Sequence, residues 1–303
     1  MSNYLIGDFI RDTRLRRGYT QEELSFGICT PASLSRIENS SQTPGKHILD
    51  ALLQRLGVQD QIFDVFVSKA EMEIYETIQA ITRNIADYNY TELEKQILEL
   101  EKRVQGGYEL QRQYIVFARG ILKMGRGGDM QEVMASFMNA IRMTLPDFDG
   151  VTPLEQNLLT FNEITIINSI ASLYAGNGKI EEASRLEFWL KEYMDRNLID
   201  GKEKRAKYPM ILYNLSNWLR KQQRFEEAEQ LTEAGIDFCI QYGNLVALPL
   251  LVFNKGCVLA AIGNIEEAKK FFRQSTVIFE ATKQELRAKE TVELCKKHYR
   301  IEF

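Results

Sequence analysis

The sequence of 303 residues lacks the marks of several protein classes. No apolar run approaches the roughly 18–20 residues that span a bilayer, so we expect no membrane segment. The N-terminal stretch is not expected to be a signal peptide, because it carries Asp8, Arg11 and Asp12 where such a peptide is apolar. The four cysteines form no CxxC pair and no Cys…His spacing, which indicates neither a zinc site nor a disulfide framework. We expect reduced thiols in a cytoplasmic protein.

Signatures of catalysis and of bound cofactors are also missing. His47 and His298 are the only histidines, so a catalytic histidine is not expected. The sequence has no GxGxxG before a helix and no GxxxxGK[ST] phosphate loop. Glu-Glu pairs at 181–182, 226–227 and 266–267 recur with an internal repeat and begin helices, where negative charge is favourable. We therefore expect no enzyme activity, no cofactor and no metal.

The composition favours long helices in a globular chain of about two domains. Only 6 prolines and 19 glycines interrupt a sequence that is 45% hydrophobic and 26% charged, which excludes a disordered chain. The net charge of −4 argues against a general nucleic-acid coat. The first sixty residues carry seven basic and seven acidic side chains, so charge alone is weak evidence for DNA binding. Whether this segment binds DNA must therefore be judged from its residue pattern.

The first sixty residues predict short helices with strong start signals. Thr20 opens a capping box, TQEE, in which a hydroxyl and a glutamate satisfy backbone N–H groups reciprocally. Thr30 is a second hydroxyl cap and precedes a proline at the first helical position. Thr43-Pro44 predicts the start of the next helix. Two short capped helices separated by about three residues describe a helix-turn-helix.

In the stretch TQEELSFGICTPASLSRIEN the chain resembles the Cro/repressor-like helix-turn-helix family, and the likeness covers residues 4–57. Its shortened form, GIC[ST]xxxLSxIEN, is similar to the PlcR/Rgg group of peptide-responsive regulators. The resemblance implies that Arg14 pairs with Glu38 and ties the first helix to the third. A direct phosphate contact by Arg14 is the alternative.

The same resemblance and the helix geometry imply roles at DNA. The third helix would lie in the major groove, where Arg36 can make the bidentate contact that reads guanine. Gln21, Asn39 and Lys46 would hold phosphates and set the docking register. The residues expected at the DNA interface are Gln21, Thr30, Ala32, Ser33, Ser35, Arg36, Asn39 and Lys46.

The rest of the chain repeats a six-residue window of the form turn residue, any, apolar, polar, Glu, small. The windows are GDMQEV (128–133), GKIEEA (178–183), QRFEEA (223–228), GNIEEA (263–268) and a weaker YNYTEL (88–93). Their last positions lie 40, 50, 45 and 40 residues apart. Repeats of this length with helical periodicity between them predict a solenoid of helix pairs.

The details resemble the tetratricopeptide repeat. Small residues at Ala171, Ser216 and Gly256 would let the first helix of a pair approach its partner, and Phe137 and Phe272 fall where the second helix packs back. We expect an all-α fold, a helix-turn-helix followed by a right-handed tetratricopeptide-like α-solenoid of about five helix pairs and a C-terminal capping helix. The expected pairs are 71–104, 108–143, 154–197, 206–242 and 246–281, with the capping helix at 284–299.

The expected domains are a helix-turn-helix DNA-binding domain (1–57), a helical connector (58–72) and a peptide-binding and dimerisation domain (73–303). The first helices of a solenoid line a concave face that can hold an extended peptide. Asparagine recurs in the corresponding stripe, and its carboxamide offers both a donor and an acceptor to a peptide backbone. The residues expected to bind peptide are Asn168, Tyr213, Asn214, Asn217, Phe253 and Asn254. The alternative is that these asparagines are merely tolerated on a wet surface.

The order of the two halves resembles the PlcR, PrgX and Rgg quorum-sensing regulators over the whole chain. That resemblance implies a sequence-specific transcriptional regulator with a double-stranded DNA operator and a short signalling peptide. It also implies a homodimer in a Gram-positive-type cytoplasm. Three alternatives stay open: the solenoid binds a partner protein, it serves only dimerisation, or the chain is an enzyme-regulating scaffold that no longer reads DNA.

Overall fold

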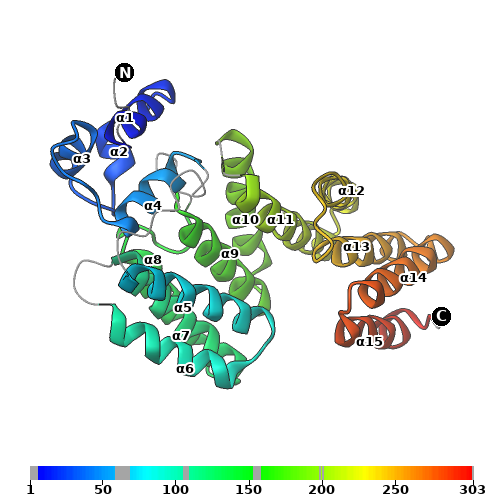
Figure 1. The fold of residues 1–303 in the computed structure, drawn as a ribbon. Helices are drawn as coiled ribbons and strands as arrows, with labels where there is room; N and C mark the ends of the chain where they lie inside the picture. Colours follow the sequence, from blue (N-terminus) through cyan, green and yellow to red (C-terminus); the bar gives the residue numbers. More distant parts are fainter. Residues whose placement is uncertain are drawn as a thin grey trace. The chain divides into compact units, whose positions relative to one another are not determined.

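The computed structural model describes residues 6–58, 69–104, 109–152, 158–197, 199 and 201–301, and every regular element in them is helical (Figure 1). The chain divides into two compact units, Met1–Leu173 with Asn197–Asp200, and Tyr174–Arg196 with Gly201–Phe303. Among the described helices none is both long and apolar enough to cross a membrane. Most of the expected connector, residues 59–68, lies outside the described residues.

Of the first four helices, the second and the third have the caps that their sequence predicts. The four helices are α1 (Ile6–Arg16), α2 (Gln21–Ser25), α3 (Pro31–Glu38) and α4 (Lys46–Arg55). Thr20 forms the complete capping box of α2, and Thr30 accepts a hydrogen bond from the Ser33 amide at the start of α3. The expected start of α4 at Thr43-Pro44 is two residues early. Gly45 keeps an extended backbone (φ −64°, ψ 155°), so the helix begins after it.

The solenoid has the five helix pairs and the terminal helix that the repeat predicts. The helices are α5 (Lys69–Ala86), α6 (Tyr90–Arg103), α7 (Glu109–Gly125), α8 (Met130–Arg142), α9 (Phe161–Gly176), α10 (Ile180–Arg196), α11 (Gly201–Lys221), α12 (Phe225–Tyr242), α13 (Leu248–Ala261), α14 (Ile265–Ala281) and α15 (Glu285–Leu294). A π-helical turn, Cys295–Tyr299, follows α15. Helix α11 begins five residues before the expected 206, so Pro209 lies inside it rather than in its first turn. Helix α9 begins at Phe161 rather than at the expected 154, and residues 158–160 before it are not helical.

Close approach within the pairs occurs at the small residues. A Cβ atom at Gly256 of α13 would lie 2.6 Å from the Phe272 ring of α14, and one at Gly120 of α7 would lie 2.7 Å from the Phe137 ring of α8. Both phenylalanines are fully buried, as is Ser216 of α11. The small residues therefore make room for the aromatic ring of the partner helix, as the repeat pattern predicts.

Candidate functional site

Helix α3 carries most of the residues expected at DNA on its exposed side. Thr30, Ala32, Arg36 and Asn39 are exposed, and Ser33 is half-buried, as is Ser35. The opposite side of the helix, with Leu34 and Ile37, belongs to the core of this domain. The guanidinium of Arg36 donates to Ser33 Oγ at 3.3 Å and is otherwise open to solvent. The exposed face of α3 thus presents one fork-shaped donor that suits a guanine edge.

Two residues expected to hold phosphates have partners inside the domain. Lys46 is 8% exposed, and its Nζ donates to Asp50 Oδ1 at 2.7 Å. Gln21 is half-buried, and its Nε2 donates to Glu38 Oε2 at 2.8 Å. Each nitrogen keeps further N–H donors beyond the bond it makes inside the domain, so these placements are compatible with a structural role and with a phosphate contact.

The pair between Arg14 and Glu38 is present and buried. Arg14 Nε donates to Glu38 Oε1 at 2.6 Å, and Arg14 Nη2 donates to Glu38 Oε2 at 2.8 Å. The third nitrogen, Nη1, donates to the Tyr19 carbonyl at 2.8 Å. The hydrogen bonds to Glu38 raise the pKa of Arg14. This bidentate pair fixes α1 against α3 and so holds the exposed face of α3 in one orientation.

A second buried pair joins the helix-turn-helix to the start of α9. The side chains of Arg55 and Glu163 are fully buried, with Arg55 Nη2 and Glu163 Oε1 3.5 Å apart. Arg55 also donates to the carbonyls of Leu24 and Phe26, at the end of α2. Glu163 in turn accepts from the Thr160 amide at 2.5 Å, which closes a capping box at α9. The pair therefore connects the turn of the DNA-binding motif to a solenoid helix within one unit.

In the second unit, α11 has four half-buried polar or aromatic side chains within about two turns, namely Tyr213, Asn214, Asn217 and Arg220. Asn214 Nδ2 donates to Glu187 Oε1 on α10 at 3.2 Å. Asn217 Oδ1 accepts from Arg220 Nη2 at 2.8 Å. Tyr213 packs at the edge of a buried cluster around Leu251. The three expected residues of this helix thus share one half-buried stretch of α11.

The two expected peptide-binding residues of α13 differ in exposure. Phe253 is half-buried and stacks on Phe272, with ring centroids 5.2 Å apart. Asn254 was expected at the surface, and that expectation is wrong, because it is 2% exposed. Its Nδ2 donates to Ser216 Oγ at 2.7 Å and to Thr232 Oγ1 at 3.3 Å, which ties α13 to α11 and α12. Asn168 is half-buried on α9, in the first unit.

Glu187 is a buried carboxyl that the sequence reasoning missed. It is fully buried on α10, and among the described residues Oε2 has no hydrogen-bond partner. Burial raises its pKa well above the ordinary value, against the opposing effect of the Asn214 hydrogen bond. The carboxyl is therefore neutral at pH values where exposed glutamates are charged.

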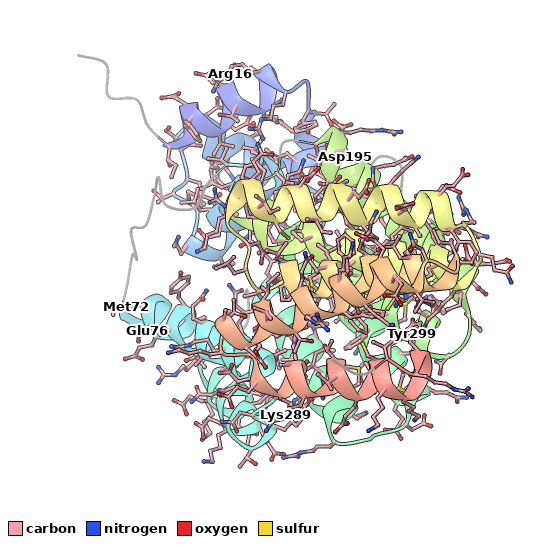
Figure 2. The ribbon with its side chains drawn as sticks, turned by 90° about the vertical axis from the view of Figure 1, so that its right-hand side faces the viewer. Arg16, Met72, Glu76, Asp195, Lys289 and Tyr299 are labelled. Atoms are coloured by element: carbon pink, nitrogen blue, oxygen red, sulfur yellow. The ribbon has the colours of Figure 1, made fainter. Side chains whose placement is uncertain are left out.

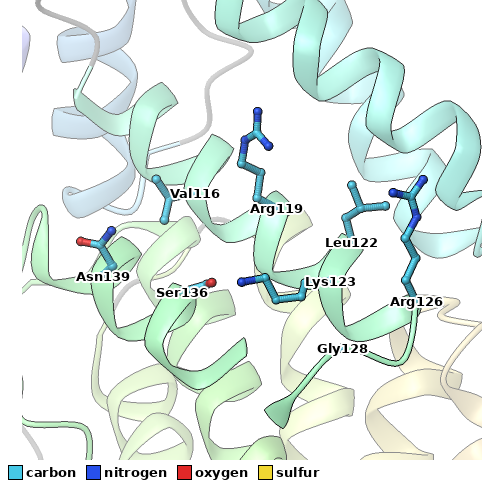
Figure 3. A pocket seen from close by; sticks show the side chains of 8 residues that line it. All are labelled: Val116, Arg119, Leu122, Lys123, Arg126, Gly128, Ser136 and Asn139. Atoms are coloured by element: carbon cyan, nitrogen blue, oxygen red, sulfur yellow. The ribbon is translucent and has the colours of Figure 1, made fainter. Parts of the chain in front are cut away.

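A hollow of about 480 Å³ lies between α7 and α8 (Figure 3). Three of its lining residues are basic, namely Arg119, Lys123 and Arg126. Each already pairs with a glutamate, at 2.5, 3.1 and 2.7 Å respectively. The local charge is balanced, and the hollow contains none of the expected site residues. Across the described parts of the chain, no group of His, Cys, Asp or Glu could hold a metal ion.

Family models match both parts of the chain. Residues 152–300 match the RNPP family C-terminal domain, and residues 10–63 match a helix-turn-helix model. The C-terminal match spans just under half of the chain, and the helix-turn-helix match includes α2, α3 and α4.

Solved structures share the fold of this chain. PlcR of Bacillus thuringiensis in complex with the peptide PapR7 and DNA is 19% identical, with a TM-score of 0.64, and the match covers 95% of this chain and 98% of that chain. The apo form of PlcR is 17% identical, with a TM-score of 0.61 and the same coverage. A search of curated proteins finds no match.

Proposed function

We propose that this chain is a sequence-specific DNA-binding transcriptional regulator controlled by a short signalling peptide. The exposed side of α3 carries the proposal for DNA, because it is polar, holds Arg36 and is fixed from below by the Arg14–Glu38 pair. The match of residues 152–300 to the RNPP C-terminal domain supports peptide control. PlcR, which shares the fold, has been solved with both a peptide and DNA.

The proposed DNA contacts divide by role. Arg36 reads a base, and Ala32, Ser33 and Ser35 lie near base edges. Thr30 and Asn39, at the two ends of α3, contact the DNA backbone and set the docking register. Gln21 and Lys46 act indirectly, by stabilising the fold of the domain. A single helix-turn-helix buries too little surface for tight specific binding, so the proposal includes a homodimer on a palindromic operator.

The proposed peptide site uses Asn214 and Asn217 as backbone partners, with Tyr213 and Phe253 as apolar contacts. Asn254 supports these residues from beneath through Ser216. Asn168, on α9 of the first unit, is proposed separately as a peptide contact. The proposed domains keep the limits 1–57, 58–72 and 73–303, and the proposed location is the cytoplasm.

Selection of bound DNA from a randomised pool tests the DNA half of the proposal. The wild type should enrich a palindrome, and Arg36→Ala should cost about 1–3 kcal/mol of binding and relax one base pair in each half-site. Arg273→Ala is the matched control, because Arg273 is an exposed arginine on α14, remote in sequence from the motif. Unchanged affinity and sequence preference in Arg36→Ala would remove α3 from the major groove.

A further inference from the structure

Arg220, in the last turn of α11, has no carboxylate partner among the residues that the structure describes. Its Nη2 donates to Asn217 Oδ1 at 2.8 Å. Within the described part of the chain its guanidinium has no other hydrogen bond and no ion pair, and its Nε is buried. A guanidinium has five N–H donors, so most of this side chain's hydrogen-bonding capacity is unused.

The arginines of the first unit show how this chain treats a buried guanidinium elsewhere. Arg14 has two carboxylate bonds and one carbonyl bond. Arg55 donates to two carbonyls and to the Glu163 carboxylate, although its Nε has no partner among the described residues. Both of these arginines therefore have a carboxylate partner. Leaving a buried donor without an acceptor costs free energy, and the cost is removed when a ligand brings the acceptor.

Arg220 lies near three titratable groups that are neutral at neutral pH. Its charge acts on Tyr213 of α11, Cys257 of α13 and Tyr299 at the end of the π-helical turn (Figure 2), because it lowers the pKa of each. Burial has the larger effect and raises all three pKa values above their ordinary range. Neither the two phenols nor the thiol is therefore an anion at neutral pH, and Arg287 adds a second positive charge near Tyr213.

We propose that Arg220 receives a carboxylate of the bound peptide, an inference that rests on the peptide control proposed above. A carboxylate matches the planar fork of the guanidinium and supplies the missing anion. Asn217 holds the guanidinium in place, one turn along α11 from it. Asn214 lies a further turn back, so the amides meet the peptide backbone and Arg220 meets its acid group.

Two sources could supply this carboxylate, the free C-terminus of the peptide or an Asp or Glu side chain. Three pools of seven-residue peptides separate them: apolar peptides with a free C-terminus, the same peptides amidated, and amidated peptides with one Glu. Thermal shift finds the pools that bind, and calorimetry measures the affinities of their best members. Binding only of the free-acid pool assigns the C-terminus, and binding of the amidated Glu pool assigns a side chain.

Variants of Arg220 test the residue itself. Arg220→Gln should weaken carboxylate peptides about ten- to hundredfold and make acid and amide forms bind alike. Arg220→Lys, which keeps the charge without the fork, should recover part of that loss. The matched control is Arg224→Gln, because Arg224 is exposed and already paired with Glu227 at 2.6 Å.

The outcomes separate this inference from the function on which it rests. Equal affinity of the wild type for acid and amide forms, with or without Glu, would overturn the role of Arg220 and leave peptide control standing. If none of the pools stabilises the wild type, peptide control falls together with the Arg220 site. The comparison of acid and amide on the wild type needs no variant, so a folding defect in Arg220→Gln would not obscure the result.

Discussion

The helix-turn-helix and the α11 stretch of the second unit both contain polar networks, but only the first is closed. Glu38 accepts two hydrogen bonds from Arg14 and one from Gln21, and every nitrogen of the Arg14 guanidinium donates. On α11, Arg220 has one bond and a buried Nε without a partner in the described residues. A closed network holds a rigid scaffold, whereas an open one has capacity left for a ligand.

Among the described residues, the lack of hydrogen-bond partners is local to this stretch and is not a property of the whole second unit. Asn254 lies in the same unit and has both of its donor bonds, to Ser216 and Thr232. Those two hydroxyls donate in turn to backbone carbonyls of Tyr213 and Ala228. The same unit thus satisfies both donors of its buried amide, while Arg220 keeps donors without a partner among the described residues. That contrast favours a binding role for Arg220 and a structural role for Asn254.

Breaking the closed network should have the largest effect on stability. Glu38→Ala leaves Arg14 buried without its anion, which costs about 3–5 kcal/mol. Urea unfolding followed by hydrogen exchange at residues 6–58 would measure the loss in the intact chain. Glu22→Ala, an exposed glutamate on α2, is the matched control and should change stability by less than about 0.5 kcal/mol.

The double variant Arg14→Ala/Glu38→Ala isolates the pair. It should be less destabilised than the sum of the single variants, because the second change removes the uncompensated charge. Strict additivity would mean that the two residues do not interact. The Arg14–Glu38 pair could then no longer serve as the example of a closed network.

Asn254→Ala should have an intermediate effect. It removes both donor bonds of a buried amide and leaves a small cavity, for a loss of about 1–3 kcal/mol. Asn217→Ala should instead change peptide affinity more than stability, because its partner Arg220 is the open group. Denaturant unfolding and calorimetry on both variants, with the exposed Asn139→Ala as control, would measure this. The reverse pattern would contradict the assignment of the two networks.

Local signals made the helices predictable. The capping box at Thr20, the hydroxyl cap at Thr30 and the repeated windows act within a few residues, so they can be read from sequence alone. The limits differ in three places: Gly45 delays α4, α11 begins early enough to include Pro209, and α9 begins only at Phe161. The Arg14–Glu38 pair also came from a resemblance whose residues are all present.

Burial around the solenoid helices was harder to predict. Helix α13 is apolar on nearly every side, so its periodicity did not reveal that Asn254 points inward. Glu187 and Arg220 gave no local signal, because their environments come from neighbouring helices. The contact between Arg55 and Glu163 joins positions 108 residues apart, although the T-x-x-E capping box that begins at Thr160 was a signal that could have drawn attention to Glu163.

The smallest expected effect concerns pH and tests the other open group, Glu187. Its folded pKa is raised from an ordinary value of 4.5, mainly by burial. Between the unfolded and the folded pKa, the native state binds more protons than the unfolded state, so this carboxyl makes stability fall as pH rises. Below that window its effect vanishes.

Glu187→Gln should remove this contribution, because the amide is neutral at every pH and keeps an oxygen for Asn214. The variant should therefore match the wild type near pH 4 and become increasingly more stable than it as pH rises toward 8. Urea unfolding across that range would measure the difference, with Glu181→Gln, an exposed position on the same helix, as the control. A difference that stays flat with pH would mean that Glu187 is as easily ionised as an exposed glutamate. Glu187 would then be an ordinary charged carboxylate. It would no longer distinguish the polar network of α11 from the Arg14–Glu38 network.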